Sequence, residues 1–591
     1  MFFYQRFRKY RHWLIFLLTA IFTVSFFPLH PSYSQTSLTD IEGHWAQPCI
    51  QQLAQRRIIS GYPDGTFRPD LSVTRAEFAA IVTNAFPDAA TIRDSREFRD
   101  IPRNYWATEK IRQAYQTGFL SGYPNGVFQP TQKIPRVQVL VALAAGLNYT
   151  PSLPVDALLS QTFADTEAIP NYAKNGVAAA AEKQLVVNYP QVRKLQPNEL
   201  ASRGEVAAFV CQAVGIEGVV AKGYIANPTK AELRGVWLTN IDSDVLFSRE
   251  GLSAAVDKLD ELNFNTLYPT VWNNGYTLYP SSVAKDVTGI ELDPEPGLQG
   301  RDMLEEVVAL GQNKGMAVIP WFEFGFMAPA DSQLAKLHPD WLVERRDGST
   351  IWLEGGVLER VWLNPLHPEV QEFLTDLVTE IVGKYDVDGI QFDDHFGYPS
   401  DFGYDDFTTN LYQDSHDGNA PPNDYQDEEW LAWRADKITE YMEGLFREIK
   451  KENSSAIVSV SPNPQEFSYN SYLLDWEKWE RKGLIEELLV QVYRSDLAKF
   501  QEELKQPPLV TANSHIPTGV GILSGIKPRQ VGWEQIAKQV ESVRDENLGG
   551  MSFFFYETLW NLAPESVAER QAGLQKIFGL PVERPVVSSN K

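Results

Sequence analysis

Apolar and polar residues alternate along residues 387–395, which read VDGIQFDDH. Ile390 and Phe392 fall on one face of an extended chain, and Gln391 and Asp393 fall on the other, because successive strand side chains point to opposite sides. A barrel strand covered by helices needs an apolar outer face. The pattern therefore predicts a parallel barrel strand that ends in carboxylates, at the end where such barrels carry their chemistry.

Seven further short segments have the apolar, β-branched and aromatic content of strands. With the first one they lie at 235–241, 265–272, 316–326, 387–395, 456–464, 487–495, 518–525 and 549–557. Helical patterns separate them, for example at 250–262, 301–314, 368–384, 427–451 and 530–546. Eight strands alternating with helices predict an α/β domain, a TIM-type (β/α)₈ barrel, over residues 232–580.

The chain before this barrel contains an internal repeat. Residues 61–69 read GYPDGTFRP, residues 122–130 read GYPNGVFQP, and a more divergent copy at 188–197 reads NYPQVRKLQP. Each turn joins two helical patterns, and the Pro-Asp-Gly and Pro-Asn-Gly sequences supply the positive φ of a tight reversal. We expect a multidomain chain, with an all-α three-repeat bundle at 37–95, 96–157 and 158–216 and a linker over 217–231.

These repeats resemble S-layer homology domains over roughly residues 37–216, most closely in the first two copies. The resemblance implies a bundle that binds cell-wall polysaccharide and carries a Thr-Arg-Ala-Glu signature, here at 74–77, in a binding groove. The planar fork of an arginine suits the acidic groups of a glycan. Arg75 and Glu77 also fit a local role as a helix cap and ion pair. The implied wall-glycan residues are Trp45, Arg75, Glu77, Arg136 and Arg203.

Residues 1–34 have the features of an export signal. Basic residues precede an apolar run at 13–27, which is short for a membrane span, and a small-residue cleavage site follows. A retained membrane anchor is the alternative. We expect no membrane span after signal removal and a disordered tail over residues 581–591.

Composition narrows the possible partners. The net charge of −24 argues against nucleic acid, because phosphate binding needs a basic surface. Cys49 and Cys211 form either a disulfide or two buried thiols in an exported chain. Two cysteines alone cannot build a metal site, and we expect neither a metal nor another cofactor.

Aromatic, amide and carboxylate side chains gather where the predicted strands end. Rings stack on the apolar faces of sugars, and amides bond to sugar hydroxyls. The barrel is therefore predicted to bind a polysaccharide. The predicted substrate-binding residues are Trp237, Asn240, Trp272, Trp321, Gln391, His395, Tyr398, Asn463, Gln491, Tyr493 and Trp560.

Two carboxylates that flank a glycosidic bond are the minimum machinery for its hydrolysis. Asp393 is the predicted nucleophile or cation stabiliser, with Asp394 beside it. As general acid, Glu557 is slightly preferred to Glu323, although both lie in apolar segments that raise a carboxyl pKa. Either glutamate also fits a substrate hydrogen bond or an ion pair. The sequence leaves retention and inversion of configuration open.

Residues from about 232 to 560 resemble the glycosyl-hydrolase-like 10 family of bacterial envelope proteins. The resemblance rests on RGVWLTN, WLNPLHPEVQ, KYDVDGIQFDDHFGYP, WRADKI and LLVQVYR. It implies a glycosidase-type barrel whose better-understood relatives act on peptidoglycan glycan strands, with Asp393, Asp394, Gln491 and Tyr493 in the site. The strand also has the phase of the DGxRxD strand of amylase-type barrels. Gln391 replaces that arginine, so the positive charge beside Asp393 is missing there.

The sequence thus predicts an exported, wall-anchored glycoside hydrolase that acts on a cell-envelope polysaccharide, with peptidoglycan glycan strands as the expected substrate. One alternative is a non-catalytic glycan-binding or structural envelope protein. Another is a metal-dependent polysaccharide deacetylase using Asp394 and His395, although none of the eight histidines forms the His-x-x-x-His pair it needs. The acidic loop at 401–427 fits either a solvated loop or a structural Ca²⁺ site built from Asp401, Asp405 or Asp406.

Overall fold

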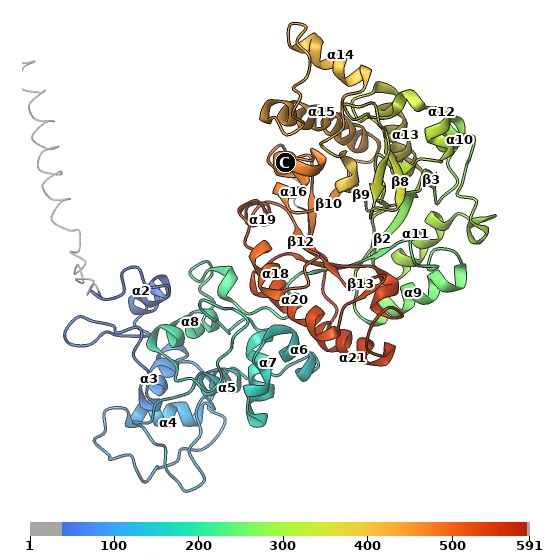
Figure 1. Cartoon of the computed structure of the whole chain (residues 1–591). Coiled ribbons are helices and arrows are strands. Elements are labelled where there is room, and N and C mark those ends of the chain that lie inside the picture. The colour runs from blue at the N-terminus through green and yellow to red at the C-terminus, as the bar shows by residue number, and fades with distance from the viewer. Residues whose placement is uncertain (1–37, 588–591) are drawn as a thin grey trace, which may run out of the picture. The chain divides into compact units, whose positions relative to one another are not determined.

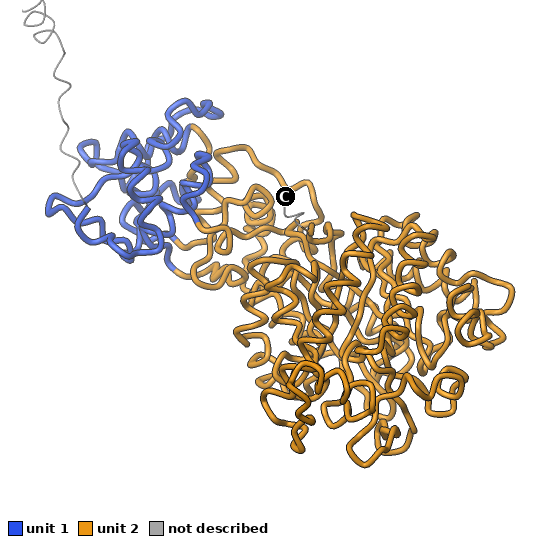
Figure 2. Tube along the Cα trace, turned by 90° about the horizontal axis from the view of Figure 1, so that it is seen from above, with its two compact units in different colours: residues 1–116, 122–134, 200–220 blue, residues 117–121, 135–199, 221–591 orange. Residues whose placement is uncertain are grey.

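The computed structural model in Figure 1 describes residues 38–587, so the predicted export signal at 1–34 lies outside the described residues. Within the described part, no helix has both the length and the apolar character needed to cross a membrane. The chain divides into two compact units (Figure 2). Among the described residues, unit 1 holds 38–116, 122–134 and 200–220, and unit 2 holds 117–121, 135–199 and 221–587. Most of the third repeat therefore belongs to the same unit as the barrel.

Parallel strands at eight positions close into a barrel within the described part of unit 2. Around the sheet they run β1, β15, β12, β11, β10, β9, β5 and β2, and β2 pairs again with β1. The third position is broken into two short strands, β4 and β5, which both pair with β2. The predicted TIM-type barrel is confirmed. The strands are β1 (Leu233–Leu238), β2 (Thr266–Asn273), β4 (Ala317–Val318), β5 (Trp321–Phe322), β9 (Gly389–Asp393), β10 (Ile457–Ser461), β11 (Glu487–Gln491), β12 (Thr518–Leu523) and β15 (Gly550–Phe554).

Helices cover the outside of the barrel (Figure 1). Ile390 and Phe392 of β9 point toward them and are completely buried in the main apolar core. The apolar alternation of residues 387–395 is therefore explained by burial under helices, as the sequence predicted. The covering helices include α9 (Arg249–Glu261), α11 (Met303–Asn313), α13 (Pro368–Lys384), α15 (Glu428–Glu452), α17 (Trp476–Arg481), α18 (Leu497–Glu503), α19 (Pro507–Asn513), α20 (Trp533–Asp545) and α21 (Val567–Ile577).

A three-stranded antiparallel sheet is inserted after the third barrel strand. It consists of β6 (Met327–Pro329), β7 (Trp352–Glu354) and β8 (Leu358–Trp362), with β8 in the centre. The sequence analysis did not predict this sheet, because two of its strands are only three residues long and give no clear alternation. Its position at the carboxyl end of the third strand brings it to the mouth of the barrel.

The opposite end of the barrel contains a buried ion pair. Glu487, at the start of β11, is completely buried and accepts hydrogen bonds from Tyr268 and Ser459, both at 2.9 Å. Arg584 supplies the positive charge to the same carboxylate. Residues 581–587, which the sequence placed in a tail without structure, are therefore held at the barrel by a charged contact.

The repeats contain α2 (Gln47–Gln55), α3 (Arg75–Ala85), α4 (Thr108–Gln116), α5 (Arg136–Gly146), α6 (Val155–Thr162), α7 (Lys174–Glu182) and α8 (Arg203–Ala213). Isolated β-bridges also occur between the repeats of unit 1, joining Ser72 to Ser202 and Thr74 to Lys133. A purely helical bundle therefore stays a prediction.

The predicted linker at 217–231 is bonded to the third repeat. Ala226 donates its backbone N–H to Val186 O at 2.9 Å, and Asn188 donates to Tyr224 O at 2.9 Å. Gln161 of α6 donates its side-chain amide to Pro228 O at 2.7 Å. These contacts attach the segment to unit 2 along much of its length.

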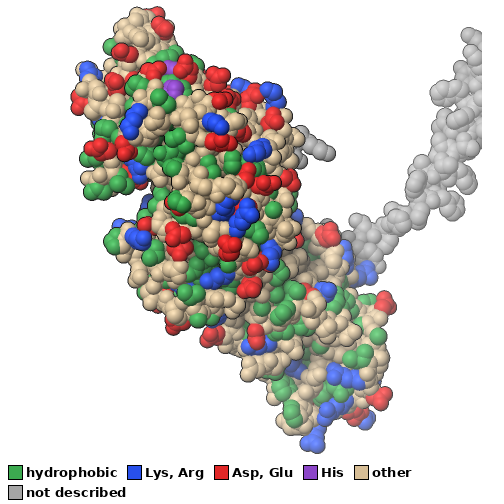
Figure 3. Space-filling model, turned by 90° about the vertical axis from the view of Figure 1, so that its right-hand side faces the viewer, with side chains coloured by type: hydrophobic (Ala, Val, Ile, Leu, Met, Phe, Trp, Pro, Cys, Tyr) green, Lys and Arg blue, Asp and Glu red, His purple; other side chains and the backbone are tan. Residues whose placement is uncertain are grey.

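The two cysteines do not form a disulfide. Cys49 of α2 and Cys211 of α8 are buried free thiols, and the neighbouring Cys211 together with burial raises the pKa of Cys49. Acidic and basic side chains are interspersed over the face that Figure 3 shows.

Candidate active site

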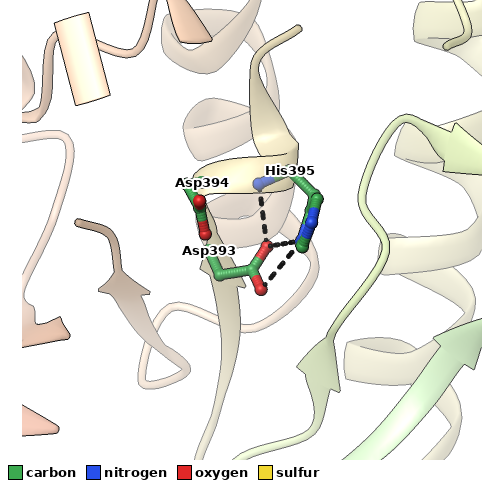
Figure 4. Close-up of side chains that lie close together, drawn as sticks. All are labelled: Asp393, Asp394 and His395. Carbon is green, nitrogen blue, oxygen red and sulfur yellow. Dashed lines mark hydrogen bonds and ion pairs between the residues drawn. The ribbon is translucent and has the colours of Figure 1, made fainter. Parts of the chain in front are cut away.

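Three polar residues in succession end the fourth barrel strand (Figure 4). Asp393 is the last residue of β9, and Asp394 and His395 begin a short 3₁₀ helix, η6 (Asp394–Phe396). The Asp393 carboxylate accepts the backbone N–H of His395 at 3.0 Å, and the ring Nδ1 of His395 lies 3.1 and 3.2 Å from its two oxygens. Asp394 is turned away from this pair and accepts a hydrogen bond from Asn463 Nδ2 at 2.6 Å.

Asp393 and His395 form a charged pair. Burial raises the pKa of Asp393 to about 6, and His395 opposes that rise. Burial lowers the pKa of His395, but the Asp393 carboxylate outweighs burial and raises the pKa of His395 to about 10. At neutral pH the imidazole is therefore positive and the carboxylate negative. His395 thus supplies the positive charge that Gln391 does not provide.

Glu323 follows β5 and is only 5% exposed. Its oxygens accept hydrogen bonds from Thr239 at 2.8 and 3.1 Å, from Thr270 at 2.9 Å and from Asn273 at 2.8 Å. Burial raises the pKa of Glu323 to about 7 against these donors, and the charge of Asp393 adds to the rise. A glutamic acid that keeps its proton near neutral pH is suited to general-acid catalysis.

The floor of the site is formed by residues two positions before the two carboxylates, on the same inward face. Trp321 precedes Glu323 by two residues and Gln391 precedes Asp393 by two, so each points into the barrel. Trp237 Nε1 donates to Gln391 Oε1 at 2.7 Å, and the rings of Trp237 and Trp321 are 6.1 Å apart. All three side chains are at most 2% exposed. These predicted residues therefore close the barrel interior and present no open stacking face.

The walls of the site come from neighbouring strand ends. Asn240 accepts a hydrogen bond from Asn273 at 2.9 Å, and Gln491 Nε2 donates to a backbone carbonyl of β10 at 2.7 Å. The ring of Tyr493 stacks on Phe554 at 5.5 Å. Burial raises the pKa of the Tyr493 hydroxyl, and the charges of the three carboxylates of the site raise it further. The Tyr493 hydroxyl therefore lies within electrostatic range of all three carboxylates.

Glu557 lies in a different environment. It belongs to η7 (Tyr556–Leu559), beyond the end of β15, where it accepts hydrogen bonds from Asn561 and, at 3.4 Å, from Ser243. Among the described residues, no hydrogen bond or ion pair joins Glu557 to Asp393. The charge of Asp393 acts on Glu323, the less preferred general acid of the sequence analysis, whereas the charge of Glu557 acts on Lys258 and Tyr556.

Three aromatic residues predicted for substrate binding lie outside the site. Trp272 is completely buried, donates to Gly325 O at 2.9 Å and packs edge-on against a phenylalanine of α13. Tyr398 is completely buried, and the charge of Arg434 acts on its hydroxyl. Trp560 lies 3.4 Å from the amine of Lys258, on the outer layer of helices. Sequence spacing could not reveal that these rings are buried against neighbouring elements.

The inserted sheet adds residues that the sequence analysis missed. His395 stacks on Trp362 of β8 at 5.7 Å and lies 5.9 Å from the ring of Phe324. Arg360, two residues before Trp362 on the same face, pairs with Glu354 at 2.7 Å. The strand that carries these residues, β8, reads LERVW, which has no alternation that could have revealed it in the sequence.

A metal ion would have to compete with contacts already made. Asp393, Asp394 and His395 each offer one ligand atom within 4.8 Å of the others, the single such cluster among residues 38–587. However, Asp393 is bonded to His395, and Asp394 is bonded to Asn463. A cation at this place needs both contacts rearranged.

The acidic loop also has protein partners. Asp401 pairs with Arg345 at 2.5 Å, and Asp405 caps α14 (Asp406–Ser415) by accepting the backbone N–H of Thr408 at 2.9 Å. These contacts account for part of the loop's acidic content without an ion.

The predicted wall-glycan arginines follow one pattern. Arg75 Nε donates to Phe128 O at 2.9 Å, Arg136 Nε to Leu195 O at 2.8 Å, and Arg203 Nε to Phe67 O at 2.7 Å. Each arginine thus reaches the turn of the next repeat and is at least nine-tenths buried. Glu77 completes a capping box with Thr74, and Trp45 is half-buried. These contacts stabilise the junctions between repeats, while glycan binding remains a prediction.

The fold and the site together define a glycosidase-type barrel: a (β/α)₈ barrel with two buried carboxylates of different acidity at its carboxyl end. The sequence profile of the glycosyl hydrolase-like 10 family matches residues 232–542, and that of the S-layer homology domain matches 37–79, 97–139 and 162–207. The chain belongs to the glycosyl hydrolase-like 10 family.

Several known proteins are similar to parts of the chain. "Glycosyl hydrolase DigH" of Escherichia coli K12 is 25% identical over 305 residues, 44% of this chain and 65% of that protein. The amylopullulanase of Thermoanaerobacterium thermosulfurigenes is 28% identical over 196 residues, 32% of this chain and 10% of that protein. The cellulosome-anchoring protein of Acetivibrio thermocellus is 44% identical over 79 residues, 13% of this chain and 18% of that protein. The chain thus spans less than two thirds of each of these relatives.

Proposed function

We propose that the barrel hydrolyses O-glycosidic bonds of a cell-envelope polysaccharide. The observation that carries the proposal is the pair Glu323 and Asp393, two buried carboxylates whose environments give them different protonation states. The pKa of Glu323 is raised to about 7, and Asp393 is paired with a positive imidazole. One carboxyl group that holds its proton beside one that is ionised is the arrangement that glycoside hydrolysis requires.

In the proposed mechanism, Glu323 donates its proton to the glycosidic oxygen as the bond to the anomeric carbon breaks. Water then adds to that carbon and returns a proton to Glu323. Asp393 acts on the opposite side, as a nucleophile or as the carboxylate that stabilises the developing positive charge, and His395 keeps it ionised. Asn463 orients Asp394 through their 2.6 Å hydrogen bond, so that its free oxygen accepts a sugar hydroxyl. Tyr493 offers a neutral hydroxyl to the same sugar, because its raised pKa keeps the phenol protonated.

The proposed substrate is the glycan strand of peptidoglycan, and the proposed location is the cell envelope. The S-layer homology repeats support anchoring, because the cellulosome-anchoring relative shares 44% identity with part of this chain. Holding an enzyme on its polymer raises the effective substrate concentration without any new contact in the site. The repeats are thus proposed to bind wall polysaccharide while the barrel cleaves.

The test uses the chain without residues 1–34 and three variants: Asp393→Asn, Glu323→Gln and, as the matched control, Glu557→Gln. Each protein is incubated with peptidoglycan glycan strands, with and without stem peptides, and released fragments are identified by mass spectrometry. We expect fragments from the wild type and the control, and a loss of at least about 100-fold in the other two variants. Equal release by wild type and Asp393→Asn contradicts the proposal. Binding of strands without any release supports a glycan-binding protein instead.

A further inference from the structure

A second pocket opens in unit 2 at the opposite end of the barrel from the carboxylates. It lies where β1 begins and just before β15, and the third repeat and residues 222–232 complete its walls. Its volume is about 330 Å³, which is at the small end of the range of ligand pockets. The proposed hydrolysis uses none of its residues.

The lining of this pocket is strongly basic. It contains one carboxylate, Glu232, and five basic side chains: Arg193, Lys222, Lys230, Arg234 and Arg544. Glu232 is shared, because it accepts from Arg544 at 2.7 and 2.8 Å and from Arg234 at 2.8 Å. Since the whole chain carries a net charge of −24, such an excess of positive charge in one small pocket needs an explanation.

Each of the three arginines keeps one nitrogen without a hydrogen-bond partner among the described residues. These atoms are Nε of Arg193, Nη2 of Arg234 and Nη1 of Arg544. The three side chains are only 8%, 0% and 7% exposed. Asp545 lies 3.5 Å from Arg193 Nε without making a hydrogen bond, and Glu541 pairs with the other side of that guanidinium. Buried charged donors are normally satisfied, so three orphans in one pocket indicate a missing acceptor.

Arg234 and Arg544 share the one carboxylate that lines the pocket, Glu232. Burial lowers the pKa of Arg234; Glu232 opposes this, and the nearby Arg544 lowers the pKa further. Glu541 adds its charge to Arg544 and pairs with Arg193, to which Asp545 also lies close, so Lys222 and Lys230 at the exposed rim carry the surplus positive charge. An anion with several oxygens can accept hydrogen bonds from these unpaired nitrogens and also balance the excess positive charge.

We propose that this pocket binds a phosphate group, either free or as the monoester of a sugar. Guanidinium groups pair with phosphate oxygens through several N–H donors at once, and the rim lysines attract the anion from solution. A bound phosphate bridges Arg193 of the third repeat to Arg234 and Arg544 of the barrel. It therefore stabilises unit 2 in addition to occupying the pocket.

The first test follows thermal unfolding of the chain without residues 1–34. Inorganic phosphate is compared with chloride at equal ionic strength, and glucose 1-phosphate is compared with glucose. We expect a saturable rise in the unfolding temperature with a phosphate-bearing compound, and matching heat in isothermal titration. If glucose 1-phosphate reaches its half-maximal effect at a lower concentration than inorganic phosphate does, the ligand is a phosphosugar. If inorganic phosphate reaches it at the lower concentration, the ligand is free phosphate. The absence of a saturable rise with both compounds overturns the proposal.

The second test uses variants that leave the buried arginines untouched. The double variant Lys222→Met and Lys230→Met removes charge only from the rim, and we expect it to weaken phosphate binding about tenfold. Lys314→Met is the matched control, since Lys314 also precedes a barrel strand but pairs with Asp257 at 2.9 Å outside the pocket. Equal phosphate responses of wild type, double variant and control would show a general salt effect and overturn the proposal.

Discussion

At the scale of single residues, burial and neighbouring groups give two carboxyl groups different protonation states. Glu323 is surrounded by two threonine hydroxyls and an amide, all neutral, so burial dominates and its proton is held. Asp393 is equally enclosed, but it has the imidazole of His395 beside it. A neutral environment and a cationic one, in the same mouth, produce an acid and a base from chemically similar side chains.

This division predicts a bell-shaped dependence of kcat/KM on pH. Asp393 must be ionised, so activity falls as the pH drops below about 6, and Glu323 must be protonated, so activity falls as the pH rises above about 7. The measurement is initial rates of glycan cleavage between pH 4 and pH 9, on the order of ten points. The Glu557→Gln control should keep the same two limbs. A rate that continues to rise above pH 8 contradicts the assignment of Glu323 as the acid.

The same raised pKa predicts a pH-dependent stability effect of Glu323→Gln. The folded protein binds this proton more tightly than the unfolded chain, so wild-type stability falls as the pH rises from about 4.5 to about 7. The full loss corresponds to about 3 kcal/mol above pH 7. Glutamine has no charge to bury, so the variant should gain stability relative to wild type at pH 8 and gain none at pH 4. Urea unfolding at both pH values measures this, and equal differences at both would refute it.

At the scale of elements, the sequence predicts what short-range periodicity can encode. Each barrel strand carries its own apolar face, so the eight strands and the inward direction of Asp393 were predictable. The inserted sheet was not, because β6, β7 and β8 pair with one another across loops and are too short for a periodic signal. Nor was the direction of Glu557, since β15 ends at Phe554 and the chain then coils into η7.

The inserted sheet yields a prediction about substrate binding. Trp352 of β7 contacts Trp362 edge-on at 5.8 Å, and Trp362 stacks on His395. Trp352→Ala removes this support, and we expect kcat/KM to fall about fivefold because an aromatic pair contributes about 1 kcal/mol. Trp433→Ala, in α15 and also half-buried, is the matched control. If both variants lose the same activity, the effect is a general loss of stability and the specific role of β7 is refuted.

At the scale of the whole molecule, segments distant in sequence complete unit 2. Arg584 from the last described residues enters the amino end of the barrel and pairs with Glu487. Gln161 of the third repeat accepts the backbone N–H of Leu580 at 3.2 Å and donates to Pro228 O at 2.7 Å. These contacts depend on single polar residues in segments without a periodic apolar pattern. The sequence analysis therefore predicted a linker at 217–231 and a tail at 581–591.

Arg584→Met is predicted to destabilise unit 2. It leaves the Glu487 carboxylate, whose side chain is 1% exposed, without a positive partner, at a cost of about 3 kcal/mol. The urea midpoint should therefore fall. The double variant Arg584→Met with Glu487→Gln should recover most of the loss, since no buried charge remains. An unchanged midpoint in the single variant would show that the ion pair does not contribute to stability.

The attachment of the third repeat to the barrel makes these two parts of unit 2 one body. The hydrogen bonds of Gln161 join α6 to both the 217–231 segment and the chain after α21, so this repeat has no slack tether to the catalytic domain. These contacts lie at the amino end of the barrel strands, and the carboxylates lie at the carboxyl end. Within unit 2, the mouth therefore lies at the other end of the barrel from residues 158–199 of the third repeat. For the wall-anchored hydrolase proposed above, this part of the repeat keeps a fixed distance from the mouth and is not joined to the barrel by a flexible leash.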